Sequence, residues 1–272
     1  GGDLLVVSET ESGNHLWGEG PGSWQLAWAP DGKTLAAMVY EGDLLLHNGE
    51  DGSVLCKIKA LSPDQRTERP THQFRFNPDG TTLATTGGDG TARLWDAMTG
   101  EPSDEPFTGH PRGASGIEFS PDGTILAVGS HGGIIRLWDV EAHQLIGQPL
   151  DAGGARTWDL ALSPDGQILA AACEDGMLRL WDMATGLPIG PPLNSQFSAT
   201  FGVDFSPDGS ILATSGKGDG KAGTVRFWDM NPEAWRERAC AIAGRNLTQA
   251  EWERYLPDVP YAVTCKQWPA GE

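Results

Sequence analysis

The stretch "SPDGTILAVGSHGGIIRLWDV", from Ser120 to Val140, holds two apolar runs, each introduced by a turn, and ends with Trp-Asp. Nearly the same string returns as "SPDGQILAAACEDGMLRLWDM", from Ser163 to Met183. A chain that spells one unit repeatedly at a fixed spacing is built from structural repeats, so the unit itself predicts the architecture.

Two markers measure the repeat. Pro-Asp-Gly begins at positions 30, 78, 121, 164 and 207, so the steps are 48, 43, 43 and 43 residues. Trp-Asp follows it by 17 residues in three units and by 21 in the last, which carries the insertion "KGDGKAG". The Trp-Asp residues are Trp95, Asp96, Trp138, Asp139, Trp181, Asp182, Trp228 and Asp229.

A complete unit predicts four short antiparallel strands, and the last unit leaves the repeat after its third strand, "TVRFWD". In the third, "ASGIEFS" alternates, "PDG" turns the chain, "TILAVGS" is almost wholly apolar, "IIRLWD" follows the next turn, and "QLIGQPL" can add an outer strand. Pro presets φ and Gly accepts positive φ, so Pro-Asp-Gly is a strong turn signal. Four strands in about 40 to 45 residues describe one blade of an all-β, β-propeller fold.

These residues resemble the WD-repeat β-propeller family. The matching pieces are "LWD" in three units, "FWD" in the fourth, the five Pro-Asp-Gly turns and one Gly-His, at Gly109-His110. The resemblance implies a buried Asp–His–Ser/Thr–Trp network in some blades. Only His110 supplies its histidine here, so the other blades are expected to depend more on packing. The first unit is degenerate, with "LLLHN" in place of a Trp-Asp strand.

The beginning of the chain predicts part of a further blade. "GDLLVVSETESG" aligns with "GTARLWDAMTG" from Gly90, so 3–8 is expected to be a third strand and 14–20 a fourth. Two readings follow. Residues 15–19 could pair with the last blade and close a ring of five, or the native ring has about seven blades and the chain is a fragment. The second reading is favoured, because the chain starts inside a blade and without an initiator Met, and an unclosed sheet edge would expose unpaired backbone groups.

Residues 231–272 leave the repeat, so the chain divides into a propeller at 1–230 and a tail at 231–272 that packs on it. "NPEAWRERACAIAGRNL" has helical spacing, and "LTQAEWERYL" carries a capping box from Thr248 to Glu251. The tail resembles the ends of WD-repeat regions in large bacterial signalling proteins with a STAND-type NTPase or a kinase-like module. That resemblance implies an upstream effector domain and a sensor or scaffold role.

Composition restricts the partners. The formal net charge is -18, and so acidic a surface disfavours nucleic acid and anionic membranes. No apolar run reaches the roughly 20 residues of a membrane span, and the first residues do not read as a signal peptide. A cytoplasmic location with reduced thiols is the default expectation. A disulfide between Cys240 and Cys265 stays open.

The sequence gives no sign of catalysis, of a cofactor or of a metal site. It has no GxxxxGK[ST], no HExxH and no GxSxG, and the apolar second strands supply no cluster of carboxylates or histidines. The predicted function is therefore a non-catalytic scaffold or sensor that binds a protein on a propeller face. The alternatives are a hydrolase or lyase with a site in the central channel, and a structural cap for an oligomer.

Two sets of residues are candidates for partner contact. Arg66 and Arg69 lie in an unusually long loop, "LSPDQRTERPTH", and long loops without structure of their own are often functional. Trp17, Trp24 and Trp158 lie where blades begin or end, and an exposed aromatic side chain there could anchor a partner.

Overall fold

The computed structural model describes residues 7–8, 15–17, 23–39, 43–59, 73–103, 105–218, 223–231, 245–246, 248–250, 263 and 265. Within them the chain forms five antiparallel sheets of three or four strands, in which sequence neighbours pair, and one short hairpin. This confirms the predicted all-β propeller fold. Of the predicted tail, only a few residues from 245 onward are described, so its two helices lie mostly outside that range.

The sheets are the blades, numbered here from first to fifth. The first contains β3 (Ser23–Trp28), β4 (Thr34–Val39), β5 (Leu44–Asn48) and β6 (Val54–Ile58). The second contains β7 (Phe74–Phe76), β8 (Thr82–Thr86) and β9 (Ala92–Asp96). The third contains β10 (Ala114–Phe119), β11 (Ile125–Ser130), β12 (Ile134–Asp139) and β13 (Gln144–Asp151).

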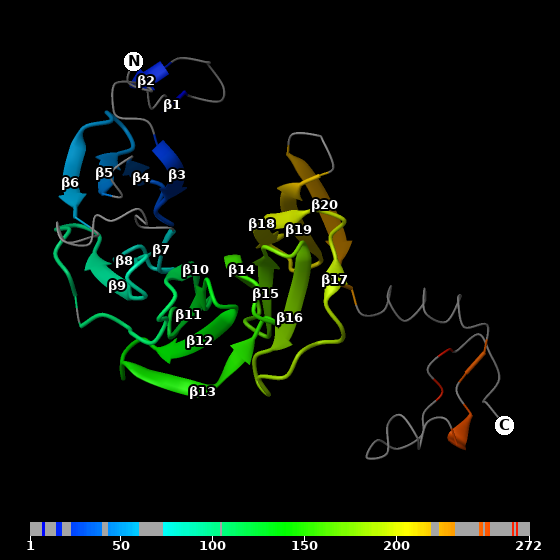
Figure 1. Cartoon of the computed structure of the whole chain (residues 1–272). Coiled ribbons are helices and arrows are strands. Elements are labelled where there is room, and N and C mark those ends of the chain that lie inside the picture. The colour runs from blue at the N-terminus through cyan, green and yellow to red at the C-terminus, as the bar shows by residue number, and fades with distance from the viewer. Residues whose placement is uncertain are drawn as a thin grey trace.

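The fourth blade contains β14 (Thr157–Leu162), β15 (Ile168–Cys173), β16 (Met177–Asp182) and β17 (Leu193–Asn194). The fifth contains β18 (Ala199–Phe205), β19 (Ile211–Lys217) and β20 (Thr224–Asp229). In Figure 1 the blades follow one another in an arc, and an opening separates β3–β6 from β18–β20. The described part of the chain is thus an open arc of blades.

Local turn chemistry explains why every blade has the same shape. Asp122 of the third Pro-Asp-Gly accepts hydrogen bonds from Thr124 N at 3.1 Å and from Ser120 Oγ at 2.5 Å. Gly123 follows with φ 75°, a conformation that glycine adopts without strain. Equivalent bonds recur at Asp79, Asp165 and Asp208. The turn therefore fixes the register of the first two strands in each of these units.

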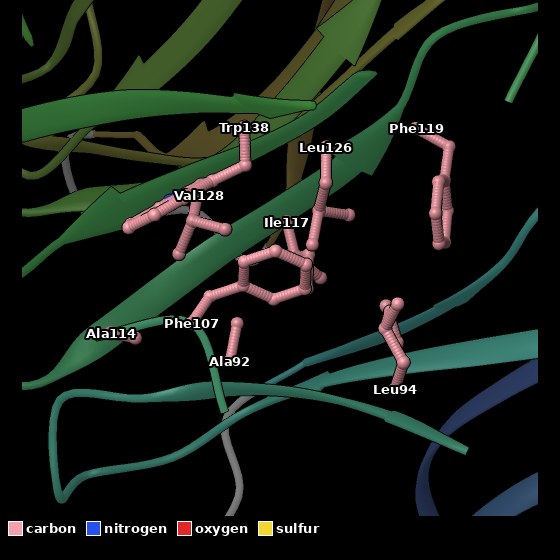
Figure 2. Close-up of a cluster of buried hydrophobic side chains, with 10 residues drawn as sticks. Ala92, Leu94, Phe107, Ala114, Ile117, Phe119, Leu126, Val128 and Trp138 are labelled. Carbon is pink, nitrogen blue, oxygen red and sulfur yellow. The ribbon is translucent and has the colours of Figure 1, made fainter. Parts of the chain in front are cut away.

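The hydrophobic core lies between blades. In Figure 2, Phe107, Ala92 and Leu94 of the second unit face Ile117, Val128 and Trp138 of the third. Similar clusters join the first blade to the second, the third to the fourth and the fourth to the fifth. Because each blade buries its faces against its neighbours, the repeats stabilise one another in sequence order.

The N-terminal strands pair as a third and a fourth strand would. β1 (Val7–Ser8) pairs antiparallel with β2 (His15–Trp17), with Val7 opposite Trp17. The alternative in which residues 15–19 close the ring on the last blade is wrong for this structure, because β2 pairs with β1 and not with β20.

The cysteines fall into two groups. Cys56 and Cys173 are free thiols, and burial raises the pKa of Cys173 to about 11. Cys265 is disulfide-bonded, which departs from the default expectation of reduced thiols, while Cys240 lies outside the described residues. Asn246 is buried; its Oδ1 accepts from Cys265 N at 2.8 Å, and its Nδ2 donates to Cys265 O at 3.1 Å.

None of the described helical residues forms a helix long and apolar enough to cross a membrane.

Candidate functional site

The first strand of each blade lies nearest the centre of the arc, beside the first strands of its neighbours. An open cavity of about 510 Å³, the channel cavity, lies among these strands. Its lining residues come from the five inner strands and from β19 and β20; they are Leu26, Ala27, Arg75, Glu118, Asp159, Gly202, Val203, Asp204, Ala213, Thr214, Ser215 and Val225.

A single arginine joins three blades in this cavity. Arg75 of β7 donates from Nε to Glu118 Oε2 of β10 at 3.0 Å and from Nη2 to Asp159 Oδ1 of β14 at 2.9 Å. Its side chain is about a quarter exposed (26%) and that of Asp159 is 11% exposed. Ion pairs this sheltered from water interact more strongly than exposed ones.

A second set of hydrogen bonds recurs in three of the blades. In each of them the accepting side chain belongs to the residue five positions before the proline of Pro-Asp-Gly. Gln25 Oε1 accepts from Phe74 N at 3.4 Å, Gln73 Oε1 from Ile117 N at 3.3 Å, and Asp159 Oδ2 from Val203 N at 3.1 Å. Each side chain thus ties its own inner strand to an inner strand of the following blade. Gly116 and Gly202 occupy this position in the other two units and carry no side chain.

Burial governs the protonation of the two carboxyl groups. It raises the pKa of Glu118 to about 7, although Arg75 opposes that shift. It also raises the pKa of Asp159, again against the attraction of Arg75. Burial alone would lower the pKa of Arg75, but Asp159 and Glu118 together raise it. The guanidinium stays charged, and Glu118 titrates near neutral pH.

The hydrogen bonds leave these carboxylates little freedom. Besides Arg75, Glu118 accepts from Phe119 N through Oε1. Asp159 accepts from Gln73, Arg75 and Val203. The two carboxylates are therefore held in place and link neighbouring inner strands. Asp204, which also lines the cavity, is exposed. Among the described residues, no group of three or more His, Cys, Asp and Glu could hold a metal ion.

Sequence reasoning missed this network. It weighed the apolar second strands and the turns, whereas the charges lie on the first strands. A signal existed for part of it: Arg75 and Glu118 both stand three residues before the proline of their unit and could have been expected to meet in the channel. Asp159 stands five residues before its proline, so this rule does not find it.

An aromatic patch lies at the opposite end of the blades from the Pro-Asp-Gly turns, where the inner strands begin; we call this end the strand-start face. The Arg156 guanidinium lies 3.5 Å from the centre of the Trp158 ring, and Phe201 contacts that ring edge-on with centroids 5.5 Å apart. Phe201 is 45% exposed. Trp158 Nε1 is buried and has no hydrogen-bond partner.

A bulge creates this patch in both blades. The pairing of β14 with β15 shifts between Thr157 and Asp159, and that of β18 with β19 shifts between Thr200 and Gly202. The extra residue is Trp158 in one blade and Phe201 in the other, and a bulge of this kind re-aims its side chain. Trp24 occupies the same place in the first blade, where the shift lies between Ser23 and Gln25.

The predicted partner-contact residues fall at three kinds of place. Trp158 lies in the patch, and Trp24 shares its repeat position in β3. Trp17 belongs to β2, away from the inner strands. Arg66 and Arg69 lie outside the described residues. Contact with a partner therefore stays a prediction for all five.

The Trp-Asp residues lie within the blades. Trp95, Trp138 and Trp181 are buried, and Trp228 packs beside its interblade cluster. The aspartates cap the turn after the third strand; Asp96 Oδ1, for example, accepts from Thr99 N at 2.7 Å. Asp139, Asp182 and Asp229 accept equivalent backbone bonds.

Parts of the implied tryptophan network are present. Trp95 Nε1 donates to Thr85 Oγ1 at 2.9 Å, and Trp228 Nε1 donates to Thr214 Oγ1 at 3.0 Å. In the third blade the equivalent position is Val128, and Trp138 Nε1 is buried without a partner.

His110, the one histidine of a Gly-His pair, is fully buried, and neither ring nitrogen has a hydrogen-bond partner. The turn between β11 and β12 also differs from its equivalents in the second and fourth blades. Arg93 pairs with Asp89 and Arg179 with Asp175, both at 2.7 Å, whereas the residue four before Arg136 is Gly132, so this turn has no aspartate at that position. Burial, and then the charge of Arg136, lower the pKa of His110 to about 4.

Comparison with known proteins agrees with this geometry. Four segments of the chain, residues 71–96, 101–139, 150–182 and 195–229, match the family model "WD domain, G-beta repeat". A chain in the structure titled "Crystal Structure of Mitotic Checkpoint Complex" is similar, with 20% identity and a TM-score of 0.71 over 85% of this chain and 69% of that chain. No curated protein sequence matches this one.

The matched repeats coincide with the second to fifth blades. The structural likeness shows the propeller fold, since 20% identity carries no more than that. WD repeats on a propeller are typical of protein-interaction scaffolds. The fold is therefore a β-propeller whose second to fifth blades match WD repeats, and its use by the cell has to be argued from its surface, because a fold does not by itself assign a function.

Proposed function

We propose that this protein is a non-catalytic scaffold that docks a protein partner on its strand-start face, through the patch of Arg156, Trp158 and Phe201. The observation that carries the proposal is Phe201, an aromatic side chain that is 45% exposed at a bulge. The neighbouring blade has an equivalent bulge at Trp158. Tryptophan, tyrosine and arginine are the residue types most enriched where binding energy concentrates at interfaces. A rigid inner strand holds the patch, so it is preformed for binding.

Two features of the patch support a docking role. Phe201 is 45% exposed beside the edge of the Trp158 ring, so it offers an apolar surface to a partner. The Arg156 guanidinium already covers one face of the indole ring, which adds an attractive cation–π contact and orients the side chain. A partner with an acidic segment beside an apolar residue fits these groups.

Capture with matched variants tests the proposal. The chain, immobilised by a C-terminal tag, is expected to retain a specific protein from extracts of its source cells, and Trp158→Ala with Phe201→Ala is expected to abolish retention. Met98→Ala is the control, because Met98 is 86% exposed in a turn beyond β9, away from the patch. Equal retention by the patch variant and the control would contradict docking at this place.

The wider setting is also a proposal. The tail at 231–272 resembles the ends of bacterial signalling proteins, and we propose that the propeller serves there, in the cytoplasm, as a sensor joined to an upstream effector module. Partner binding would then change the effector's activity. The test is the effector's activity with and without the captured partner.

The second candidate function is a hydrolase or lyase acting in the channel cavity. Its supporting observation is Glu118, whose pKa near 7 suits proton transfer, beside Asp159. The bonds to Arg75 count against it, because both carboxylates are already engaged. Turnover of a captured partner or ligand that Glu118→Gln abolishes would establish this alternative in place of the scaffold.

A further inference from the structure

The two bulges of the aromatic patch are joined by one side chain. Asp159 belongs to the bulge of β14, directly after Trp158, and its Oδ2 accepts from Val203 N of β18 at 3.1 Å. Val203 follows the bulge of β18 and stands two residues after Phe201. Because β14 and β18 lie side by side (Figure 1), this hydrogen bond crosses directly from one bulge to the other.

The other carboxylate oxygen of Asp159 is held from the second blade. Oδ1 accepts from Arg75 Nη2 at 2.9 Å and from Gln73 Nε2 at 3.2 Å. The side chain is 11% exposed, so water has little access to it. A sheltered carboxylate with donors on both oxygens is fixed in position, because a shift would break at least one of these hydrogen bonds.

The backbone of β18 leaves room for this carboxylate. Gly202 occupies the repeat position at which Asp159 stands in the preceding blade. A Cβ at 202 would lie 2.7 Å from Ser215 Oγ and 3.8 Å from Asp159 Oδ2. A side chain there would crowd the Ser215 hydroxyl and contact the carboxylate. The glycine therefore allows Asp159 to reach the backbone of the neighbouring inner strand.

The equivalent links elsewhere in the arc differ in two ways. Those made by Gln25 and Gln73 use an amide oxygen as the acceptor and are longer, at 3.4 and 3.3 Å. The third blade carries the small, buried Ser115 where the fourth carries Trp158. The shortest of the three links, and the only one with a carboxylate acceptor, thus lies where two aromatic residues meet across a blade boundary.

The structure assigns Asp159 as the positioning residue of the aromatic patch: it fixes the two bulges relative to each other and so sets the edge-on contact between Trp158 and Phe201. Arg75 and Gln73 hold Asp159 in turn, so the charged network of the channel supports the patch from inside the arc. Asp159 lines the channel cavity and affects a partner only through the two rings. The inference rests on the proposed function for the use of the patch, whereas the geometry can be measured on the chain alone.

A double-mutant cycle measures the contact between the rings without a partner. Trp158→Leu and Phe201→Leu, singly and together, are unfolded by urea in the parent chain and in an Asp159→Ala background. We expect the two substitutions to be non-additive in the parent, because the rings touch, and additive in the Asp159→Ala background. The general loss of stability from Asp159→Ala cancels within its cycle. Non-additivity of the same size in both backgrounds would overturn the inference.

Glu118→Gln is the matched control for this cycle. It changes the other carboxylate bonded to Arg75 and leaves the bond from Val203 to Asp159 in place. We therefore expect the two ring substitutions to stay non-additive in the Glu118→Gln background. Additivity in that background as well would show that any damage to the channel network has the same effect, which would contradict a specific role for Asp159.

Hydrogen exchange at Val203 tests the link without a destabilised variant. In the parent chain the Val203 amide donates to a side chain, and NMR is expected to show exchange at least about a hundredfold slower than in an unfolded peptide of the same sequence. Exchange as fast as in the peptide would show that the bond to Asp159 is not kept in solution and would overturn the inference.

Retention of the captured partner separates this inference from the proposed function. Asp159→Ala is expected to weaken retention at least about tenfold relative to Glu118→Gln. Ring coupling that depends on Asp159 without any loss of retention would uphold the positioning role and contradict docking on the patch. Loss of retention with unchanged ring coupling would contradict the positioning role alone.

Discussion

Arg75 and Asp159 stand 84 positions apart in the sequence, yet the arginine Nη2 donates to the aspartate Oδ1 at 2.9 Å. The bond spans a whole intervening blade, and the same guanidinium also holds Glu118 of that blade. Three successive inner strands are tied at one point. The repeat brings this about, because it places equivalent residues of different units around one channel.

Arg75→Gln is expected to lower the free energy of unfolding by about 2 to 4 kcal/mol, measured by urea denaturation. Removing one partner of a sheltered ion pair leaves two carboxylates uncompensated, and the quarter exposure of Arg75 reduces that cost. Arg112→Gln is the control, because it removes the same charge from an exposed side chain and is expected to change stability by less than about 0.5 kcal/mol. Similar losses in the two variants would contradict a special role for Arg75.

Glu118 gives stability a dependence on pH. Its pKa is about 7 in the folded protein and 4.5 is its ordinary value, so the folded state binds more protons than the unfolded state between these limits. The contribution of Glu118 therefore stabilises the fold below pH 4.5 and is lost as the pH rises through 7.

Glu118→Gln removes this titration. The free energy of unfolding of the variant, minus that of the parent, is expected to rise by up to about 3 kcal/mol from pH 4.5 to pH 8. Urea denaturation of both proteins at each pH measures this difference. Taking the difference cancels the contributions of the titratable groups that the two proteins have in common. A difference independent of pH would show that folding does not raise the pKa of Glu118.

Val128→Thr is expected to stabilise the third blade. The new hydroxyl would stand where Thr85 accepts from Trp95 Nε1 and would give the buried Trp138 Nε1 a partner. Satisfying a buried donor contributes about 1 kcal/mol, from which the loss of one methyl group has to be subtracted. The test is a double-mutant cycle with Trp138→Phe: a gain that persists in Trp138→Phe would not come from this bond.

Gly132→Asp is expected to raise the free energy of unfolding by up to about 1 kcal/mol, because an aspartate there can pair with Arg136 as Asp89 pairs with Arg93. There is room for the side chain, since the nearest side-chain atom to a Cβ at 132 would be Arg112 Cδ at 3.4 Å. Gly132→Ala is the control for the lost glycine entropy. Thermal unfolding measures both, and no difference between them would rule out the ion pair.

The sequence predicted the repeat, the blade boundaries and the turns, because each depends on residues close together in the chain. "PDG" followed after 17 residues by Trp-Asp defines strand, turn and strand without reference to distant contacts. Pairing within the N-terminal segment was also foreseen: strands were expected at 3–8 and 14–20, and the described strands β1 and β2 pair within these ranges.

The channel network could not be reached in the same way. Glu118 and Asp159 lie in strands that read as ordinary alternating segments, and neither matches a motif. Whether the two carboxylates come together depends on which inner strands are neighbours. It also depends on the bulge in β14, which changes the direction of the side chains of residues 158 and 159. Trp24 and Trp158 were singled out for their position at blade ends, but their shared bulge is visible only in the pairing register.

Docking of a partner on the strand-start face, with no chemical change to that partner, has a direct signature. Hydrogen–deuterium exchange of the chain is measured with and without its captured partner. We expect the partner to slow exchange in residues 156–159 and 199–203, and its mass to stay unchanged after incubation. Slower exchange confined to other segments, or a cleaved or otherwise modified partner, would contradict this proposed function.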